Sequence, residues 1–239
     1  MLHKNSLGLE MDKILFIKIA VGVVWGLLIG FAGIPISKKL ILKRSDDPGD
    51  TIVLNNKIFK VVIIGVSLVC AVCAALTADG WALLVRNLLL LLPMLSIAIV
   101  DSLIRKIPNP LLLAMIIVQG VYLAYNCIES QTTNLLISAG FGFFIGFLCC
   151  TIPSILRVPV GAGDIKYSAV IGLCIYFMNY MQAMVIMGLL AAVALVVLKA
   201  TKKGGLKTLI PMGPFLSVGA VISMCFPLVE NVLSKVGMF

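Results

Sequence analysis

The sequence has little charge. Only 12% of its 239 residues are Asp, Glu, Lys or Arg, whereas 61% are hydrophobic. Soluble domains carry about 25% charged and 45–50% apolar residues, so this composition excludes an ordinary soluble fold. We therefore expect an all-α, polytopic integral membrane protein, and the length of the chain suits a single domain.

Histidine is almost missing, and the single one, His3, lies near the amino terminus. Nucleophile systems of the Ser-His or Cys-His type therefore lack a general base. Neither an H-E-x-x-H segment nor a comparable ligand cluster is present, so we expect no metal and no cofactor. Cys70 and Cys73 form a C-x-x-C inside an apolar run, where thiolate ligands are disfavoured, and we interpret them as packing residues.

Acidic residues are fewer than basic ones, 10 against 19, which gives a formal charge of +9. The basic residues lie in short loops between apolar runs and do not form a basic groove with interleaved aromatics. This distribution argues against nucleic acid as a partner and favours the lipid bilayer. Arg86 is an exception, because it lies inside the run WALLVRNLLLLLP. We interpret it as structural, either reaching the outer interface or paired internally.

Stretches of about 20 mostly apolar residues indicate membrane spans. We predict about eight, at 17–37, 61–78, 81–100, 110–126, 134–154, 165–179, 182–199 and 209–228. The first resembles a secretory signal, but its length and the lack of a small-residue cleavage site predict that it is retained. Within the single membrane domain 1–239, we expect 1–60 to form this span and a loop, and 61–239 to form the helical core.

The predicted loop 38–60 is the one segment with soluble character. Its DDPGD sequence is turn chemistry. The following TIVLNNKIFK has two short β-prone runs around Asn-Asn, which indicate a small hairpin. We expect this loop to act as a solvated connector.

Loop charges predict the orientation of the chain. If loop 38–60 is cytoplasmic, alternation places 101–109, 155–164 and 200–208 on the same side, and the positive-inside rule is satisfied. These loops and their edges hold 14 of the 19 basic residues: Lys38, Lys39, Lys43, Arg44, Lys57, Lys60, Arg105, Lys106, Arg157, Lys166, Lys199, Lys202, Lys203 and Lys207.

Two aspartates stand apart from the other acidic residues, which fall in predicted loops or tails. Asp101 directly follows one span, and Asp164 directly precedes another. Both are predicted at cytoplasmic span ends, at similar depth, as two residues of one site would be. A carboxylate at membrane depth is a functional candidate. Each aspartate by itself is equally consistent with a headgroup-level residue or a helix cap.

The neighbours of the two aspartates favour a site. Gly161 and Gly163 permit positive φ and close backbone approach beside Asp164. Pro108 and Pro110 are expected to break the helix after Asp101. Irregular backbone at this depth is tolerated where it lines a wet cavity.

A pair of carboxylates supplies a known chemistry. Two carboxylates at close range do not both ionise easily, so they share a proton and titrate as a pair. They can hold a water between them: the ionised member takes its proton, and the protonated member polarises a peptide carbonyl. This hydrolyses a peptide without a metal or a covalent intermediate.

Three segments resemble the type IV prepilin peptidases, also called leader peptidases. GAGDIK matches the family's G-x-G-D-x-K signature, IVDSLIRKIPNPLLL resembles its first-aspartate segment, and IPMGPFLSVGA is similar to its late G-P-F-L segment. The three occur in the family's order over about 95–220. Presenilin-type proteases share G-x-G-D, but their Tyr-Asp and Pro-Ala-Leu segments are not found here.

The resemblance implies a helical aspartyl endopeptidase of the bacterial plasma membrane, with 61–239 as its peptidase core. Asp101 and Asp164 would be catalytic, and Gly161, Gly163, Lys166 and Pro108 would support the site. Its partners would be prepilins or pseudopilins, cut after a short basic leader at the cytoplasmic face.

One departure from the family concerns a second activity. Larger members also N-methylate the new amino terminus and carry paired C-x-x-C motifs in a cytoplasmic loop. Loop 38–60 has no cysteine, which argues against methyltransferase activity here. Two alternatives stay open: an ion- or proton-coupled transporter that uses the two aspartates, and a non-catalytic assembly subunit.

Overall fold

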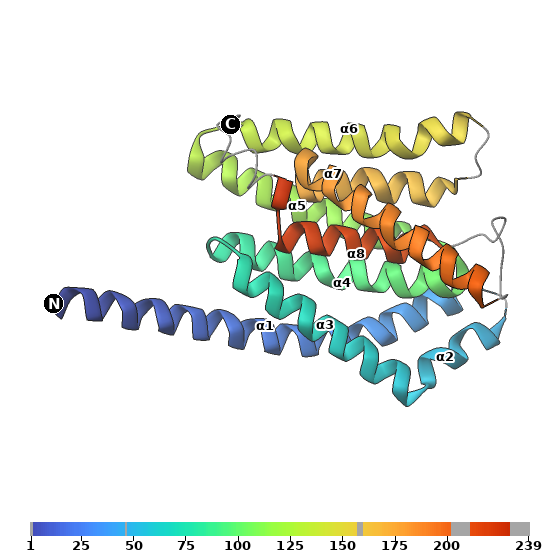
Figure 1. Cartoon of the computed structure of the whole chain (residues 1–239), viewed down its shortest axis with the longest axis horizontal. Coiled ribbons are helices and arrows are strands. Elements are labelled where there is room, and N and C mark those ends of the chain that lie inside the picture. The colour runs from blue at the N-terminus through green and yellow to red at the C-terminus, as the bar shows by residue number, and fades with distance from the viewer. Residues whose placement is uncertain (1, 46, 157–159, 202–210, 230–239) are drawn as a thin grey trace.

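The fold is built from helices (Figure 1). The structure is a computed structural model, and it describes residues 2–45, 47–156, 160–201 and 211–229. All regular elements in these ranges are helical, which confirms the all-α prediction. The elements are α1 (Leu2–Leu42), η1 (Pro48–Thr51), α2 (Ile52–Asn55), α3 (Lys57–Thr77), α4 (Trp81–Ile104), α5 (Asn109–Ser130), α6 (Asn134–Ile155), α7 (Ala162–Ala200) and α8 (Met212–Cys225).

Six helices in the described part of the chain are long and apolar enough to cross a membrane: α1, α3, α4, α5, α6 and α7. They indicate a multi-pass membrane protein. The predicted number of about eight spans is not confirmed. The predicted spans 165–179 and 182–199 both fall within the 39-residue α7, whose two halves are joined at a kink, and 209–228 contains only the 14-residue α8. Residues 209 and 210 lie outside the described ranges, as do Arg157, Lys202, Lys203 and Lys207.

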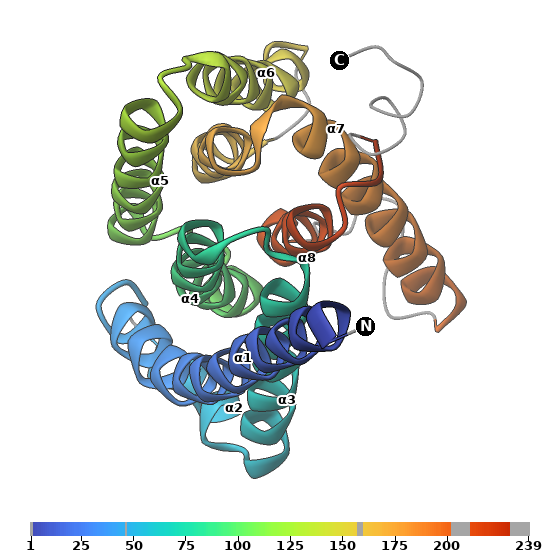
Figure 2. The same cartoon turned by 90° about the vertical axis from the view of Figure 1, so that its left-hand side faces the viewer.

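Helix α7 is broken in its middle. Tyr176 has φ 66° and ψ 169°, so two helical halves meet at this residue. This conformation is strained for a residue with a bulky side chain, and surrounding contacts must hold it. Figure 2 shows the two halves running in different directions, with the second half leaving the bundle past α8.

Helix α4 is the central element. About 67% of its 18-residue apolar stretch is buried inside the protein, against 17–28% of the corresponding stretches in the other five long helices. Figure 2 shows α4 and α8 in the middle, with α1 and α3 on one side and α5, α6 and α7 on the other. The segments that carry Asp101 and the start of α8 are therefore enclosed by protein.

Close packing of α1 on α3 depends on small residues. A Cβ at Gly26 would lie 2.7 Å from Cα of Leu68, and one at Gly30 would lie 2.9 Å from Cα of Ile64. Small residues at such spacing let helix backbones approach closely in membranes. The sequence pattern did not reveal this contact in advance.

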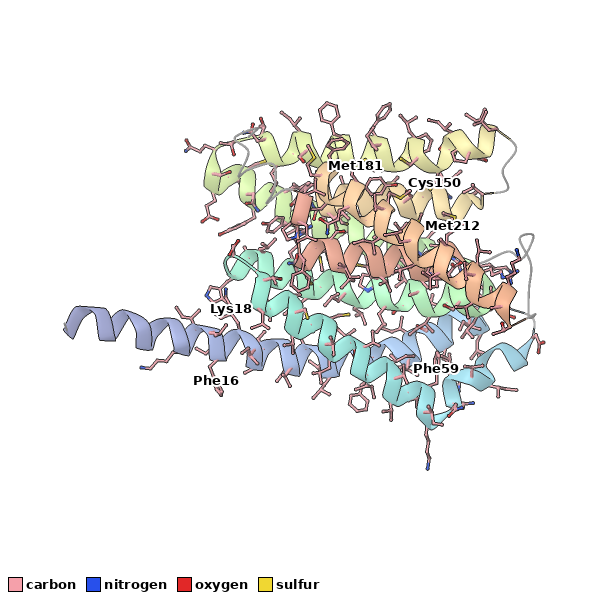
Figure 3. All side chains as sticks on the ribbon, in the orientation of Figure 1. Phe16, Lys18, Phe59, Cys150, Met181 and Met212 are labelled. Atoms are coloured by element: carbon pink, nitrogen blue, oxygen red, sulfur yellow. The ribbon has the colours of Figure 1, made fainter. Side chains whose placement is uncertain are left out.

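Large apolar side chains cover the outer surface, as a protein surrounded by lipid requires. Phe16 is 73% exposed and projects from the outer side of α1 (Figure 3). Similar side chains stand on the outer faces of α3, α5 and α6, among them Val61, Val121 and Phe144.

The predicted hairpin after loop residue 50 is wrong. Asp47 accepts a hydrogen bond from Gly49 N at 2.8 Å and starts η1, which leads directly into α2. Asn56 then caps α3, since its Oδ1 accepts from Ile58 N at 2.9 Å. The Asn-Asn pair therefore ends one helix and starts the next. Asn is favoured at helix N-caps as well as in turns, so the pair is consistent with either structure.

Candidate active site

Asp101 lies in the last turn of α4 and is 4% exposed. The helix extends one turn beyond its predicted end, to Ile104. It closes at Arg105, which adopts a left-handed conformation and whose N–H bonds to the Asp101 carbonyl. The carboxylate does not point into lipid, because its Oδ2 accepts a hydrogen bond from Gly213 N of α8 at 2.9 Å.

The prolines after Asp101 play a different part from the expected one. Helix α4 ends at Ile104, before either proline is reached. Pro108 is buried and is the N-cap of α5, and Pro110 lies in the first turn of that helix. Proline suits a first turn because the N–H it lacks has no helical partner there. The prolines thus begin α5, and left-handed Arg105 ends α4.

Asp164 lies in the first turn of α7, where Gly161 is the N-cap, and its side chain is half-buried. The Gly161 backbone N–H hydrogen-bonds to the Asp164 carboxylate. This contact resembles the reciprocal half of a capping box, in which an acidic third residue reaches back to the N-cap. Asp164 therefore does help to cap α7, as one interpretation of its position predicted.

The capping contact does not account for the second neighbour of Asp164. The Asp101 and Asp164 carboxyl groups lie near enough to interact electrostatically. The two aspartates, 63 positions apart in sequence, are thus brought together as predicted.

The segments that carry the two aspartates approach each other closely at Gly163, which has no side chain. A Cβ at Gly163 would lie 3.2 Å from Cβ of Ile107, which belongs to the connection after α4. The expectation of positive φ is not met, because Gly161 has φ −67° and Gly80 is the only positive-φ glycine in the described residues. The glycines give close approach, not unusual backbone angles.

Lys166 follows Asp164 by two residues in α7. Its side chain is exposed, and the described residues show no hydrogen bond or ion pair between it and either aspartate. Sequence reasoning placed it beside the site because of the G-x-G-D-x-K spacing. In a helix, a residue two positions away points to a different face.

Three contributors to the site were not predicted: Gly213, Ser217 and Tyr167. Gly213 and Ser217 belong to the late G-P-F-L segment, which contains them without indicating their contacts. Tyr167 follows Asp164 by one turn of α7 and is fully buried. Its OH lies 2.6 Å from Ser217 Oγ.

Arg86 is paired internally. Its side chain is 4% exposed, its Nε donates to Gln119 Oε1 at 2.9 Å, and its guanidinium also donates to the Cys174 carbonyl. The guanidinium lies over the rings of Tyr122 and Tyr176, at 5.0 and 5.2 Å from their centroids. The structural interpretation of this residue, with internal pairing, is therefore the correct one.

Two helix starts meet at the carboxylate pair. The N-cap of α7, Gly161, supplies one N–H to Asp164, and the first turn of α8 supplies one to Asp101. Helix amino termini carry partial positive charge and stabilise negative groups. The structure thus places two neighbouring carboxyl groups, one buried and one half-buried, at the end of membrane-spanning helices.

One comparison with known proteins gives a match. Residues 88–197 match the model of the type IV leader peptidase family. The match includes both aspartates and the two glycines that precede Asp164, and it confirms the resemblance found from the motifs. It also supports a peptidase. Neither a curated protein nor a solved structure gave a match.

Proposed function

We propose that this protein is a membrane aspartyl endopeptidase that removes the short basic leader from type IV prepilins or pseudopilins. The observation that carries the proposal is the proximity of the Asp101 and Asp164 carboxyl groups, near enough to interact electrostatically, inside the segment that matches the leader peptidase family. The family's substrates supply the leader and the apolar helix that follows it.

In this proposal the two carboxyl groups share one proton and hold the attacking water. The ionised aspartate takes a proton from the water as its oxygen bonds to the scissile carbonyl carbon. The protonated aspartate hydrogen-bonds to the carbonyl oxygen and transfers its proton to it, giving a tetrahedral gem-diol. The C–N bond then breaks as a proton passes to the leaving nitrogen, which yields a carboxylic acid on the leader and a free amine on the mature protein.

We further propose that cleavage takes place at the cytoplasmic face. The connections at the aspartate end of the helices hold Arg44, Arg105 and Lys106. Short loops rich in Lys and Arg stay on the cytoplasmic side. The basic leader would then meet the pair from the cytoplasm, while its apolar helix stays in the bilayer.

The test is cleavage in membranes that contain only this enzyme and a prepilin with a Gly-Phe junction. Asp101→Asn and Asp164→Asn should each reduce the rate on the order of 1,000-fold or more, because each removes half of the acid–base pair. Asp79→Asn is the matched control, since Asp79 is exposed before α4, far along the helix from Asp101. It should cleave at the wild-type rate.

Product analysis completes the experiment. The new amino terminus should begin at the residue after the leader and should be free of methyl groups, and chelators should leave the rate unchanged. Full processing by either Asn variant would contradict the two-aspartate mechanism. Ion or proton flux that depends on both aspartates, without cleavage, would favour the transporter.

A further inference from the structure

A third helix, α8, contacts the catalytic pair. Its second residue, Gly213, donates its backbone N–H to Oδ2 of Asp101 at 2.9 Å. Met212, labelled in Figure 3, precedes Gly213 at the start of this helix. Nitrogens in the first turn of a helix have no partner within the helix, so this N–H is free to bind the carboxylate.

The contact leaves no room for a side chain on Gly213. A Cβ there would lie 2.7 Å from Oδ2 and 2.9 Å from Cβ of Asp101. These distances are below those that real Cβ atoms adopt. The backbone of α8 therefore approaches Asp101 as closely as it does because residue 213 is glycine.

The next turn of α8 joins the other aspartate's helix. Ser217 Oγ lies 2.6 Å from the Tyr167 hydroxyl, and it also donates to the Gly213 carbonyl at 2.7 Å. Ser217 is 4% exposed and Tyr167 is fully buried. Tyr167 stands one helical turn beyond Asp164, and Ser217 stands one turn beyond Gly213.

Helix α4 is tied to the same hydroxyl. Ser217 Oγ lies 3.4 Å from the carbonyl of Met94, two turns before Asp101. One buried serine thus links α4, α7 and α8, the three helices whose ends form the site. Hydrogen bonds in such a low-dielectric setting are strong and are costly to leave unmade.

We propose that Gly213, Ser217 and Tyr167 are positioning residues of the peptidase site. Gly213 fixes the Asp101 carboxylate through its N–H, and the Ser217–Tyr167 hydrogen bond holds α8 in register with the helix that carries Asp164. This inference rests on the proposed function. It adds that the late G-P-F-L segment is part of the catalytic geometry and not only of the membrane anchor.

Gly213→Ala tests the contact with Asp101. The added methyl displaces the carboxylate, and misplacement of a catalytic group by about 1 Å costs on the order of 100-fold in rate. We expect kcat to fall by about that factor while KM stays within about threefold, because the substrate's binding surface is unchanged. Gly120→Ala and Gly188→Ala are the controls, since a Cβ at either residue meets nothing within 4 Å.

Ser217→Ala and Tyr167→Phe test the link between the helices. Each removes one partner of the same hydrogen bond, so the double variant should lose little more activity than either single one. Tyr180→Phe is a matched control, because the Tyr180 hydroxyl makes an equally short 2.6 Å contact with Ser168, on the side of α7 that faces α6. It should keep wild-type kcat.

The outcomes separate this inference from the proposed function. Absence of cleavage by the wild type, or full activity of Asp101→Asn, defeats the proposed function. Wild-type cleavage with inactive Asn variants, but unchanged kcat in Gly213→Ala and in Ser217→Ala, overturns the positioning role alone. Thermal melting in detergent is measured for each variant to check that it is folded. An equal loss of kcat in Tyr180→Phe and Tyr167→Phe would also overturn the positioning role.

Discussion

Gly161 governs the environment of one catalytic candidate, as Gly213 does for the other. A Cβ at Gly161 would lie 2.9 Å from Oδ2 of Asp164. Its φ of −67° is open to any residue, so the need for glycine here is one of space. Both aspartates therefore face a backbone N–H at a position where a side chain is absent.

We expect Gly161→Ala to lower kcat on the order of 10- to 100-fold, because the methyl pushes the Asp164 carboxylate away from its partner. The melting temperature should change little, since Gly161 is exposed and its backbone angles suit alanine. Single-turnover cleavage in detergent or liposomes measures the effect, with Gly120→Ala as the control. Wild-type kcat in Gly161→Ala would show that the carboxylate does not need its present position.

The two aspartates could be singled out from the sequence because both were predicted at span ends on the same side of the membrane and both lie in family-like motifs. The role of Gly213 could not be predicted, because its contact is made by a backbone N–H, which every residue except proline has. Tyr167 and Ser217 look like ordinary residues of apolar helices, and only the packing of α7 on α8 reveals their contact. The proposed catalytic side chains are thus easier to predict than the residues proposed to position them.

Among the elements, α7 shows the limit of pattern reading. Its apolar pattern predicted two spans that meet at residues 180 and 181, whereas the two helical halves of α7 meet at Tyr176. No proline or glycine marks this position. The Cys174 carbonyl, just before the break, accepts a bond from Arg86 of α4. A contact between distant segments therefore fixes the break, and local sequence cannot show it.

We expect Arg86→Met to destabilise the protein by about 1–3 kcal/mol, because it leaves the buried Cys174 carbonyl and Gln119 Oε1 without their donor. Arg86→Lys should restore only part of the lost stability, since a lysine ammonium cannot reproduce the planar set of N–H donors of the guanidinium group. Thermal unfolding in detergent measures both. Lys18→Met is the control: Lys18 also donates to a backbone carbonyl, that of Ala78 at 2.7 Å, but at a partly buried position. A loss no larger than in Lys18→Met would contradict this role.

For the whole molecule, membrane orientation decides which substrates reach the aspartates. Helix α5 connects the aspartate end of the bundle to the opposite end, since Lys106 precedes it and Thr132 follows it. Its 22 residues rise about 33 Å, and the hydrocarbon core is about 30 Å thick. Residues 106 and 132 should therefore lie on opposite sides of the membrane.

In a variant with all seven native cysteines replaced, we expect Thr132→Cys to react with a membrane-impermeant maleimide added to intact cells. Lys106→Cys should react only after permeabilisation, because positive loops stay inside. Both side chains are exposed, so access to the reagent depends on the side of the membrane and not on burial. Labelling of Lys106→Cys from outside would place the carboxylate pair at the outer face. A cytoplasmic basic leader could then never meet it, and the proposed substrate class would fail together with the orientation.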